Sequence, residues 1–262
     1  MKEWQEQELM NRLRLKGRLD LSEAISFLGV SESTARRIFT QLEDSGKVIR
    51  VHGGIQPITQ NLTEYSFELG KQHNMEEKKA IAAEAVKLLT DGDVIFCDSG
   101  TTVLCFCMEI ARMILRNPIK LQVYTDSLVA LEILSPVLQV TLTGGVYRPA
   151  RKDFCGYMAE QSLSRVFLTK CFLGSGGCDM RGYFTTTDFS TARLCEIAIK
   201  NSGTTAILCD SEKFMTHATV GFAPFSSVDR VVTDCYISEQ SKNALTERGL
   251  KISIADIDRR NK

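Results

Sequence analysis

The stretch Val94-Ile95-Phe96-Cys97-Asp98-Ser99-Gly100-Thr101-Thr102 is an apolar run that ends in a polar turn with a glycine. Four consecutive apolar residues bounded by turn residues are typical of a strand buried on both faces. A segment with helical periodicity, 102–115, follows at once. A strand that passes through a glycine turn into a helix is the repeating unit of α/β folds, so this stretch predicts the fold class of the larger part of the chain.

The alternation of strand-like and helix-like segments continues to residue 255. The expected strands after the first are 121–125, 138–143, 166–174, 204–210, 230–234 and 251–255, and the expected helices are 127–134, 191–201 and 239–248. A further helix is expected to open this region at Asn74, with Glu77 three residues on as in a capping box. Such alternation predicts an α/β domain with a mostly parallel, Rossmann-like sheet covered by helices on both faces.

Composition narrows the class of protein. The chain has 262 residues, 32 Lys plus Arg and 32 Asp plus Glu, so any affinity for nucleic acid must come from a local patch rather than from net charge. Its longest apolar run, 103–108, is far short of the roughly 20 residues that a bilayer requires, and its start lacks the apolar core of a signal peptide. We therefore expect a cytoplasmic protein of two domains with no membrane partner.

Nine cysteines lie between residues 97 and 235, without any Cys-x-x-Cys spacing. Cys105 and Cys107 form the one close pair, and they have apolar neighbours and no histidine nearby in sequence. Small buried side chains in a reducing cytosol explain this usage better than disulfides or a zinc site. We expect no metal and no cofactor.

Residues 1–56 have the pattern of a DNA-binding module. A helical stripe over 21–28 is followed by Gly29-Val30-Ser31, and a second helix is expected from there to about Asp44, capped by Ser31 or Ser33. The two helices predict a helix-turn-helix at about 20–39. An alternating ribbon over 47–54 then predicts a wing, and 57–74 is expected to link this module to the domain over 75–262.

The exposed face of the second helix and the wing supply candidate contacts to double-stranded operator DNA. Small polar and arginine side chains at the front of a recognition helix suit the major groove, and basic residues suit phosphates. The candidates are Ser31, Ser33, Thr34, Arg36, Arg37, Lys47, Arg50 and His52. Runs of basic residues are more often solvent-exposed surface than binding sites, so charge alone does not establish DNA binding.

One short helix reads too few base pairs for a specific site, and we therefore expect a homodimer or a higher oligomer.

Polar residues just past the predicted strands form the candidate effector site. Ligands bind at the carboxyl ends of strands in open α/β sheets, and helix N-termini, hydroxyls and cations there can hold a phosphate. The candidates are Asp98, Ser99, Gly100, Thr101 and Thr102 after the first strand, Thr125 and Asp126 after the second, Gly144, Gly145 and Arg148 after the third, and Lys213 after a later one. The alternative to a ligand site is that these residues have ordinary roles: the first two groups would be capped turns, the glycine pair with Arg148 a flexible loop, and Lys213 a surface lysine.

Two groups of motifs carry a family resemblance. The first is Gly29-Val30-Ser31, Ser33-Thr34-Ala35-Arg36-Arg37 and His52-Gly53-Gly54, and the second is a series of seven landmarks between Glu77 and Asp234. In sequence and in order, these motifs closely resemble the DeoR/GlpR family of bacterial sugar-catabolism regulators. This resemblance implies a winged helix-turn-helix and a ribose-5-phosphate-isomerase-like domain that binds a phosphorylated sugar as inducer. The chain departs from the family pattern at three positions. The family carries Asp at Ile38, Asn at Asp126 and Asp at Gly176.

The resemblance implies a transcriptional regulator, with repression of a carbohydrate-utilisation operon relieved by the effector. The alternative is a sugar-phosphate isomerase-like enzyme carrying a DNA-binding appendage. Isomerisation needs a positioned base, and the position of the isomerase carboxylate holds Gly176, while the three histidines are His52, His73 and His217. We therefore expect binding without catalysis. A third alternative is a module that binds only other proteins, and this alternative does not explain the polar residues at four strand ends.

Overall fold

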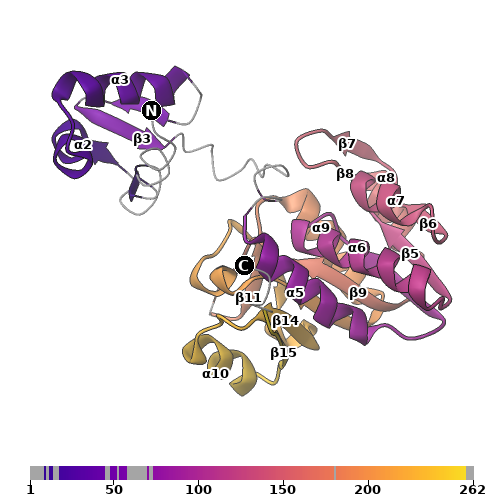
Figure 1. Ribbon diagram of the computed structural model, residues 1–262. Helices are drawn as coiled ribbons and strands as arrows, with labels where there is room; N and C mark the ends of the chain where they lie inside the picture. The colour runs from indigo at the N-terminus through magenta and orange to yellow at the C-terminus, as the bar shows by residue number, and fades with distance from the viewer. Residues whose placement is uncertain are drawn as a thin grey trace. The chain divides into compact units, whose positions relative to one another are not determined.

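The computed structural model describes residues 9, 12–13, 18–44, 48–51, 53–57, 70, 73–179 and 181–257. The chain divides into two compact units, Met1–Asn61 and Leu62–Lys262 (Figure 1). No helix within the described ranges is both long enough and apolar enough to cross a membrane.

The first unit contains helices α2 (Leu21–Leu28) and α3 (Glu32–Asp44) and a three-stranded antiparallel sheet in the order β1 (Leu19–Asp20), β3 (Gly54–Pro57), β2 (Val48–Val51). Asp20 caps α2 through a capping box with Glu23, and Gly29 ends that helix in the left-handed region at φ 62°. The Ser31 hydroxyl accepts a hydrogen bond from the Thr34 amide at 3.4 Å, so Ser31 rather than Ser33 caps α3.

A small apolar core joins the helices of the first unit to its sheet. The buried side chains are Leu9, Leu13, Leu19, Ala24, Leu28, Ile38, Phe39, Leu42, Val48 and Ile55. Ile38 is only 3% exposed, and this explains why an apolar side chain is stable at that position. The hairpin of β2 and β3 is the predicted wing, and the winged helix-turn-helix prediction is confirmed.

A seven-stranded parallel sheet forms the centre of the second unit. Its strands, in spatial order, are β15 (Lys251–Ala255), β14 (Arg230–Asp234), β12 (Ser202–Leu208), β9 (Leu168–Gly174), β4 (Asp93–Cys97), β5 (Leu121–Thr125) and β6 (Val140–Leu142). The chain runs outward from β4 to β6 and then returns to β9 on the other side. This doubly wound order places a reversal between β4 and β9, where such sheets bind ligands.

Helices cover both faces of this sheet (Figure 1). On one face, side chains of α5 (Met75–Ala85), α6 (Thr101–Arg116) and α7 (Leu128–Leu134) share a core with Ile95, Val123 and Phe172. On the other face, side chains of α8 (Tyr157–Leu163), α9 (Phe189–Lys200) and α10 (Glu239–Glu247) share a core with Phe96 and Leu173. Neighbouring strand residues therefore enter opposite cores, and the predicted α/β fold is confirmed.

Two small antiparallel sheets and three short 3₁₀ helices complete the part of the second unit that the structure describes. One sheet pairs β7 (Val146–Arg148) with β8 (Asp153–Cys155), and the other has the order β10 (Gly177–Asp179), β11 (Tyr183–Thr186), β13 (Val220–Pro224). The 3₁₀ helices are η1 (Val86–Leu88), η2 (Ser211–Met215) and η3 (Phe225–Ser227). Eight of the nine cysteines are buried, as predicted, whereas Cys235 is exposed.

The predicted capping box at Asn74 is wrong. Asn74 adopts a left-handed conformation with φ 51°, and its side chain does not cap α5. Its side-chain amide instead donates to Oδ1 of Asp210 at 3.2 Å, just past the end of β12. A tertiary contact to the sheet therefore replaces the local cap.

Candidate functional site

The start of α3 presents a group of hydroxyls and arginines. The Ser31 hydroxyl lies 3.0 Å from those of both Ser33 and Thr34. Arg36 forms an ion pair with Glu32, one turn earlier, at 2.7 Å, whereas the exposed Arg37 has no ion-pair partner within the described residues. These are the side chains that the sequence places toward DNA, and their role in binding stays a prediction.

Arg50 connects the wing to α3. Its Nη2 donates to the carbonyl of Arg36 at 3.0 Å and to the hydroxyl of Thr40 at 2.8 Å. Its guanidinium also lies 5.7 Å from the centre of the Phe39 ring and 3.5 Å from Glu43. Arg50 is therefore placed to hold the wing against the helix. The other two wing candidates, Lys47 and His52, lie outside the described residues.

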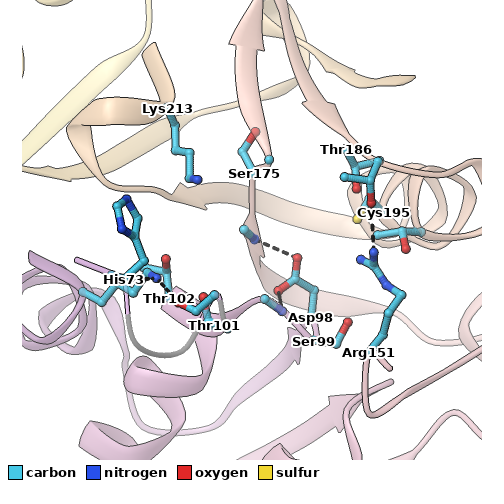
Figure 2. Close-up of a pocket in the computed structure, with 17 residues that line it drawn as sticks. His73, Asp98, Ser99, Thr101, Thr102, Arg151, Ser175, Thr186, Cys195 and Lys213 are labelled. Carbon is cyan, nitrogen blue, oxygen red and sulfur yellow. Dashed lines mark hydrogen bonds between the residues drawn. The ribbon is translucent and has the colours of Figure 1, made fainter. Parts of the chain in front are cut away.

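A pocket of about 200 Å³ lies in the second unit at the carboxyl ends of β4 and β9. Figure 2 shows Lys213, His73, Thr101 and Thr102 on one side of it and Arg151, Thr186 and Cys195 on the other. The pocket is lined by Gly70, His73, Lys78, Asp98, Ser99, Gly100, Thr101, Thr102, Arg151, Gly174, Ser175, Gly176, Thr186, Thr187, Thr191, Cys195 and Lys213. It occupies the reversal point of the sheet.

Asp98 lies at the centre of the pocket, between two glycine amides. Its Oδ1 accepts from the N–H of Gly100 at 2.8 Å and its Oδ2 from the N–H of Gly174 at 2.7 Å (Figure 2). Burial raises the pKa of Asp98 to about 6, although both amides and Arg151 oppose that rise. The carboxylate therefore fixes the close approach of the two strand ends.

The N-terminus of α6 opens beside Asp98. Gly100 is the N-cap residue, and no side chain caps the helix. The amides of its first turn are therefore available to a ligand, next to the hydroxyls of Thr101 and Thr102. This arrangement favours an anion at the lower left of the pocket in Figure 2.

Two lysines approach that end of the pocket. Lys213 comes from η2, and its ammonium has no hydrogen-bond or ion-pair partner within the part of the chain that the structure describes. Lys78 comes from α5, is 3% exposed, and donates to the carbonyls of Gly70 at 2.6 Å and His73 at 2.7 Å. Burial lowers the pKa of Lys78, while the neighbouring Asp210 raises it.

Arg151 lies at the other end of the pocket. Its Nη1 donates to the Thr187 hydroxyl at 2.9 Å and its Nε to Oδ2 of Asp153 at 3.1 Å. Arg148 does not line the pocket, because its guanidinium is held by Asp153 at 2.7 Å and by Asp188 at 2.8 Å. The structure thus places the second arginine of the loop, rather than the predicted one, at the cavity.

The other predicted residues outside the pocket lining have structural contacts. The Ser99 hydroxyl donates to Asp126 at 3.3 Å and to Asp153 at 3.1 Å, so Asp126 lies behind Ser99. Burial is the main reason why the pKa of Asp126 is raised well above its usual range. The Thr125 hydroxyl accepts from the Ser127 amide, and a side chain at Gly145 would meet the Cys155 carbonyl at 2.5 Å. Gly144, at φ 70°, belongs to the same turn.

Six of the predicted effector residues line the pocket, namely Asp98, Ser99, Gly100, Thr101, Thr102 and Lys213. Sequence reasoning missed several lining residues: Lys78 on α5, Thr186 at the end of β11, Thr187 just after it, Thr191 and Cys195 on α9, and His73, Arg151 and Ser175. Two signals were available: Lys78 belongs to a landmark of the family resemblance, and Ser175 stands next to Gly176, where the chain departs from the family pattern.

Comparisons with known proteins agree with both units. Residues 6–61 match the DeoR-like helix-turn-helix domain, and residues 73–235 match the DeoR C terminal sensor domain. The chain is 32% identical to the HTH-type transcriptional regulator GlpR of Haloferax volcanii over 86% of this chain and 87% of that protein. It is 30% identical to the lactose phosphotransferase system repressor of Lactococcus lactis over 89% of this chain and 91% of that protein.

Among solved structures, the ribose 5-phosphate isomerase A of Methanocaldococcus jannaschii is similar with a TM-score of 0.42 and 19% identity over 53% of this chain and 54% of that one. The sequence relatives are regulators, and the sensor-domain match alone spans more than half of the chain. The chain therefore belongs to the DeoR family of helix-turn-helix, DNA-binding transcriptional regulators.

Proposed function

We propose that the protein represses a carbohydrate-utilisation operon and leaves its operator when a phosphorylated sugar occupies the pocket. The observation that carries this proposal is the uncapped start of α6 at the same end of the pocket as the ammonium of Lys213. Relatives named as lactose phosphotransferase system repressors support the carbohydrate class and the sign of regulation.

The phosphate is expected at the α6 end. The pocket lining there includes Thr101, Thr102, Lys78 and Lys213, next to the uncapped amides of the first turn of α6. Hydrogen bonds between an ionised donor and an ionised acceptor are about twice as strong as neutral ones, which favours a dianion over an uncharged group. An unphosphorylated sugar has no group that takes the place of this dianion.

The sugar is expected to extend toward Arg151. Thr186 lies at that end in Figure 2, the Thr187 hydroxyl accepts from Arg151 at 2.9 Å, and Asp98 lies between the two ends. A carboxylate accepts hydrogen bonds from sugar hydroxyls well, and each oxygen of Asp98 retains a lone pair beyond the bond from its glycine amide.

The pocket is proposed to bind without catalysis and without a cofactor. Isomerisation requires a base within hydrogen-bond reach of the sugar carbon proton. Among the described lining residues, Asp98 is the one carboxylate, and it already accepts from two amides. His73 is the one imidazole, and its Nε2 lies 2.7 Å from Glu212.

Calorimetry with four phosphates tests the effector class: glucose 6-phosphate, fructose 6-phosphate, fructose 1-phosphate and ribose 5-phosphate. At least one should bind and weaken operator binding in a gel shift, while its unphosphorylated parent should do neither. Lys213→Met and Thr101→Val should bind operator normally and require at least tenfold more sugar phosphate, whereas Lys242→Met, on α10, should behave as wild type. Equal affinity for the parent sugars, or conversion of one phosphate into its isomer, would contradict the proposal.

The regulator is also proposed to act as a homodimer or higher oligomer in the cytoplasm. One recognition helix contacts too few base pairs for a specific site, and a two-fold pair doubles that number. Operators are then expected to contain two half-sites.

A further inference from the structure

We propose that Lys78 transmits occupancy of the pocket to the segment that leads to the DNA-binding unit. In this mechanism a bound phosphate draws the Lys78 ammonium away from the carbonyls of Gly70 and His73, and this releases the chain that precedes α5. The inference rests on the proposed function, because it assumes that a phosphate binds at the α6 end of the pocket.

The contacts of Lys78 place it between ligand and linker. Lys78 is one of the residues that line the pocket, and its Nζ donates to Gly70 at 2.6 Å and to His73 at 2.7 Å. Gly70 and His73 line the same pocket, so the end of the linker is part of the wall that a ligand touches. Lys78 is therefore the residue through which a ligand reaches the backbone of the linker.

The charge of Lys78 makes its position sensitive to a phosphate. The side chain is almost fully buried, and two neutral carbonyls accept two of its three N–H groups. Burial of the ammonium lowers the pKa of Lys78 despite the opposing charge of Asp210, and the nearby charge of Lys213 lowers it further, so the existing contacts stabilise the charge incompletely. A dianion is a stronger acceptor than a carbonyl and competes for the same ammonium.

A second set of contacts holds the same segment to the pocket. His73 Nε2 lies 2.7 Å from Glu212, and Asn74 donates to Asp210 at 3.2 Å. Glu212 and Lys213 are neighbours in η2, so the element that faces the ligand also holds the linker. A ligand that contacts Lys213 and Lys78 acts on both attachments of His73.

Release of Gly70 and His73 can reach the first unit because the chain preceding Gly70 leads directly to it. A ligand shifts a conformational equilibrium only by its differential affinity for the two states. In one state Lys78 contacts the phosphate, and in the other it contacts the carbonyls of Gly70 and His73. Only the first state includes the contact between Lys78 and the ligand, so the ligand favours that state. Allosteric coupling typically changes affinity by about 5–150-fold, which sets the scale of the expected effect.

The test compares Lys78→Met with Lys79→Met in the full-length protein. Lys79 is the adjacent lysine of α5; it is exposed and pairs with Glu76. Without any sugar, Lys78→Met should raise amide hydrogen exchange in peptides covering residues 70–78 and should weaken operator binding at least fivefold. Lys79→Met should match wild type in both measurements. Peptides from β4 and β9 should keep wild-type protection in both variants.

The four sugar phosphates named above supply the second part. In wild type the phosphate that binds most tightly should raise exchange in the same peptides and weaken operator binding. Lys213→Met should need more of that phosphate but reach the same final operator affinity at saturation, whereas Lys78→Met should show no further response. Glu212→Gln removes one exposed ion pair, and it should raise hydrogen exchange in residues 70–78 by less than about fivefold. This variant tests the attachment of the linker even if Lys78→Met fails to fold.

Wild-type exchange and operator affinity in Lys78→Met without sugar would overturn the inference, as would unchanged exchange in residues 70–78 of saturated wild type. If none of the four phosphates binds wild type, the proposed function fails. In that case the sugar-free comparison of Lys78→Met with Lys79→Met still decides whether Lys78 holds the linker and sets operator affinity.

Discussion

Asp98 is the residue on which the geometry of the pocket depends most. Its two oxygens hold the amides of Gly100 and Gly174, which come from the ends of two neighbouring parallel strands. The cost of this arrangement is a buried carboxylate, with a pKa raised to about 6 by burial. The folded protein therefore binds the Asp98 proton more tightly than the unfolded chain, whose ordinary value is 3.8.

The first prediction concerns stability and pH. Because the folded pKa is raised, the contribution of Asp98 is most stabilising below pH 3.8 and is lost as pH rises through about 6. The loss amounts to roughly 3 kcal/mol at about 1.4 kcal/mol per pKa unit. Asp98→Asn does not titrate, so its free energy of unfolding should improve relative to wild type between pH 4 and pH 7. Urea unfolding at several pH values measures this difference, and a constant difference would contradict the assignment.

The second prediction concerns the glycine that faces Asp98. A Cβ at Gly100 would lie 3.0 Å from Oδ1 of Asp98 and 3.4 Å from the Cα of Gly174. Asp98 cannot turn away without losing both amide hydrogen bonds, so Gly100→Ala should lower sugar-phosphate affinity at least tenfold and leave operator affinity unchanged.

Gly174→Ala is the matched control for that substitution, because its Cβ would meet nothing closer than 3.5 Å. Its effect on calorimetric affinity should be clearly smaller. If the two alanine variants bind sugar phosphate equally, the close approach of the strand ends does not shape the pocket.

At the scale of the element, α3 combines a buried face with an exposed polar face. Ile38 and Phe39 enter the core of the first unit, while Arg36 and Arg37 stay exposed. The third prediction is that Arg37→Ala weakens specific operator binding by about 1–3 kcal/mol, as expected for loss of a bidentate contact to guanine. Arg36→Ala should cost less, because Arg36 already shares its guanidinium with Glu32.

Gel shifts at fixed salt on operator and on unrelated DNA check this order of effects. Loss of a phosphate contact alone would weaken both DNAs equally, whereas loss of base recognition weakens the operator more. Wild-type operator affinity in both arginine variants would show that this face of α3 does not read DNA.

The seven strands of the large sheet and most of the helices that cover it follow from local sequence patterns, whereas α8 and the strands of the two small antiparallel sheets were not expected. The expected strands 121–125, 230–234 and 251–255 match β5, β14 and β15, because apolar runs bounded by turns determine them. The pocket was predictable only where its residues follow a strand, as Asp98 does. Nothing local separates Arg148 from Arg151, since both belong to the β7–β8 hairpin and the difference between them depends on distant partners.

Lys78 could not be placed from periodicity either. It lies on α5, before the first strand of the sheet, and reaches the pocket only because α5 begins beside the end of β12. A lysine at a buried helical position is a local anomaly, and its explanation is entirely tertiary. The left-handed Asn74 failed as a predicted cap for the same reason.

At the scale of the whole molecule, the second unit carries an exposed apolar patch on β7 and the start of α8. Val146 is 65% exposed, Tyr157 72% and Met158 66%, and a Cβ at the intervening Gly156 would lie 3.8 Å from Val146. Figure 1 shows the β7–β8 hairpin next to α8. Exposed apolar surface marks interaction sites, and the homodimer proposed above would supply the partner.

The fourth prediction is that Tyr157→Asp combined with Met158→Asp weakens self-association at least tenfold, because two carboxylates would then have to be buried between copies. Leu115→Asp, at the end of α6, changes an equally exposed apolar residue outside this patch and should leave self-association unchanged. Sedimentation velocity over a range of protein concentrations measures the association directly. Operator affinity should fall in the same double variant, because paired recognition helices bind two half-sites together. A wild-type protein that sediments as a monomer on DNA would contradict both the proposed oligomer and the role of this patch in self-association.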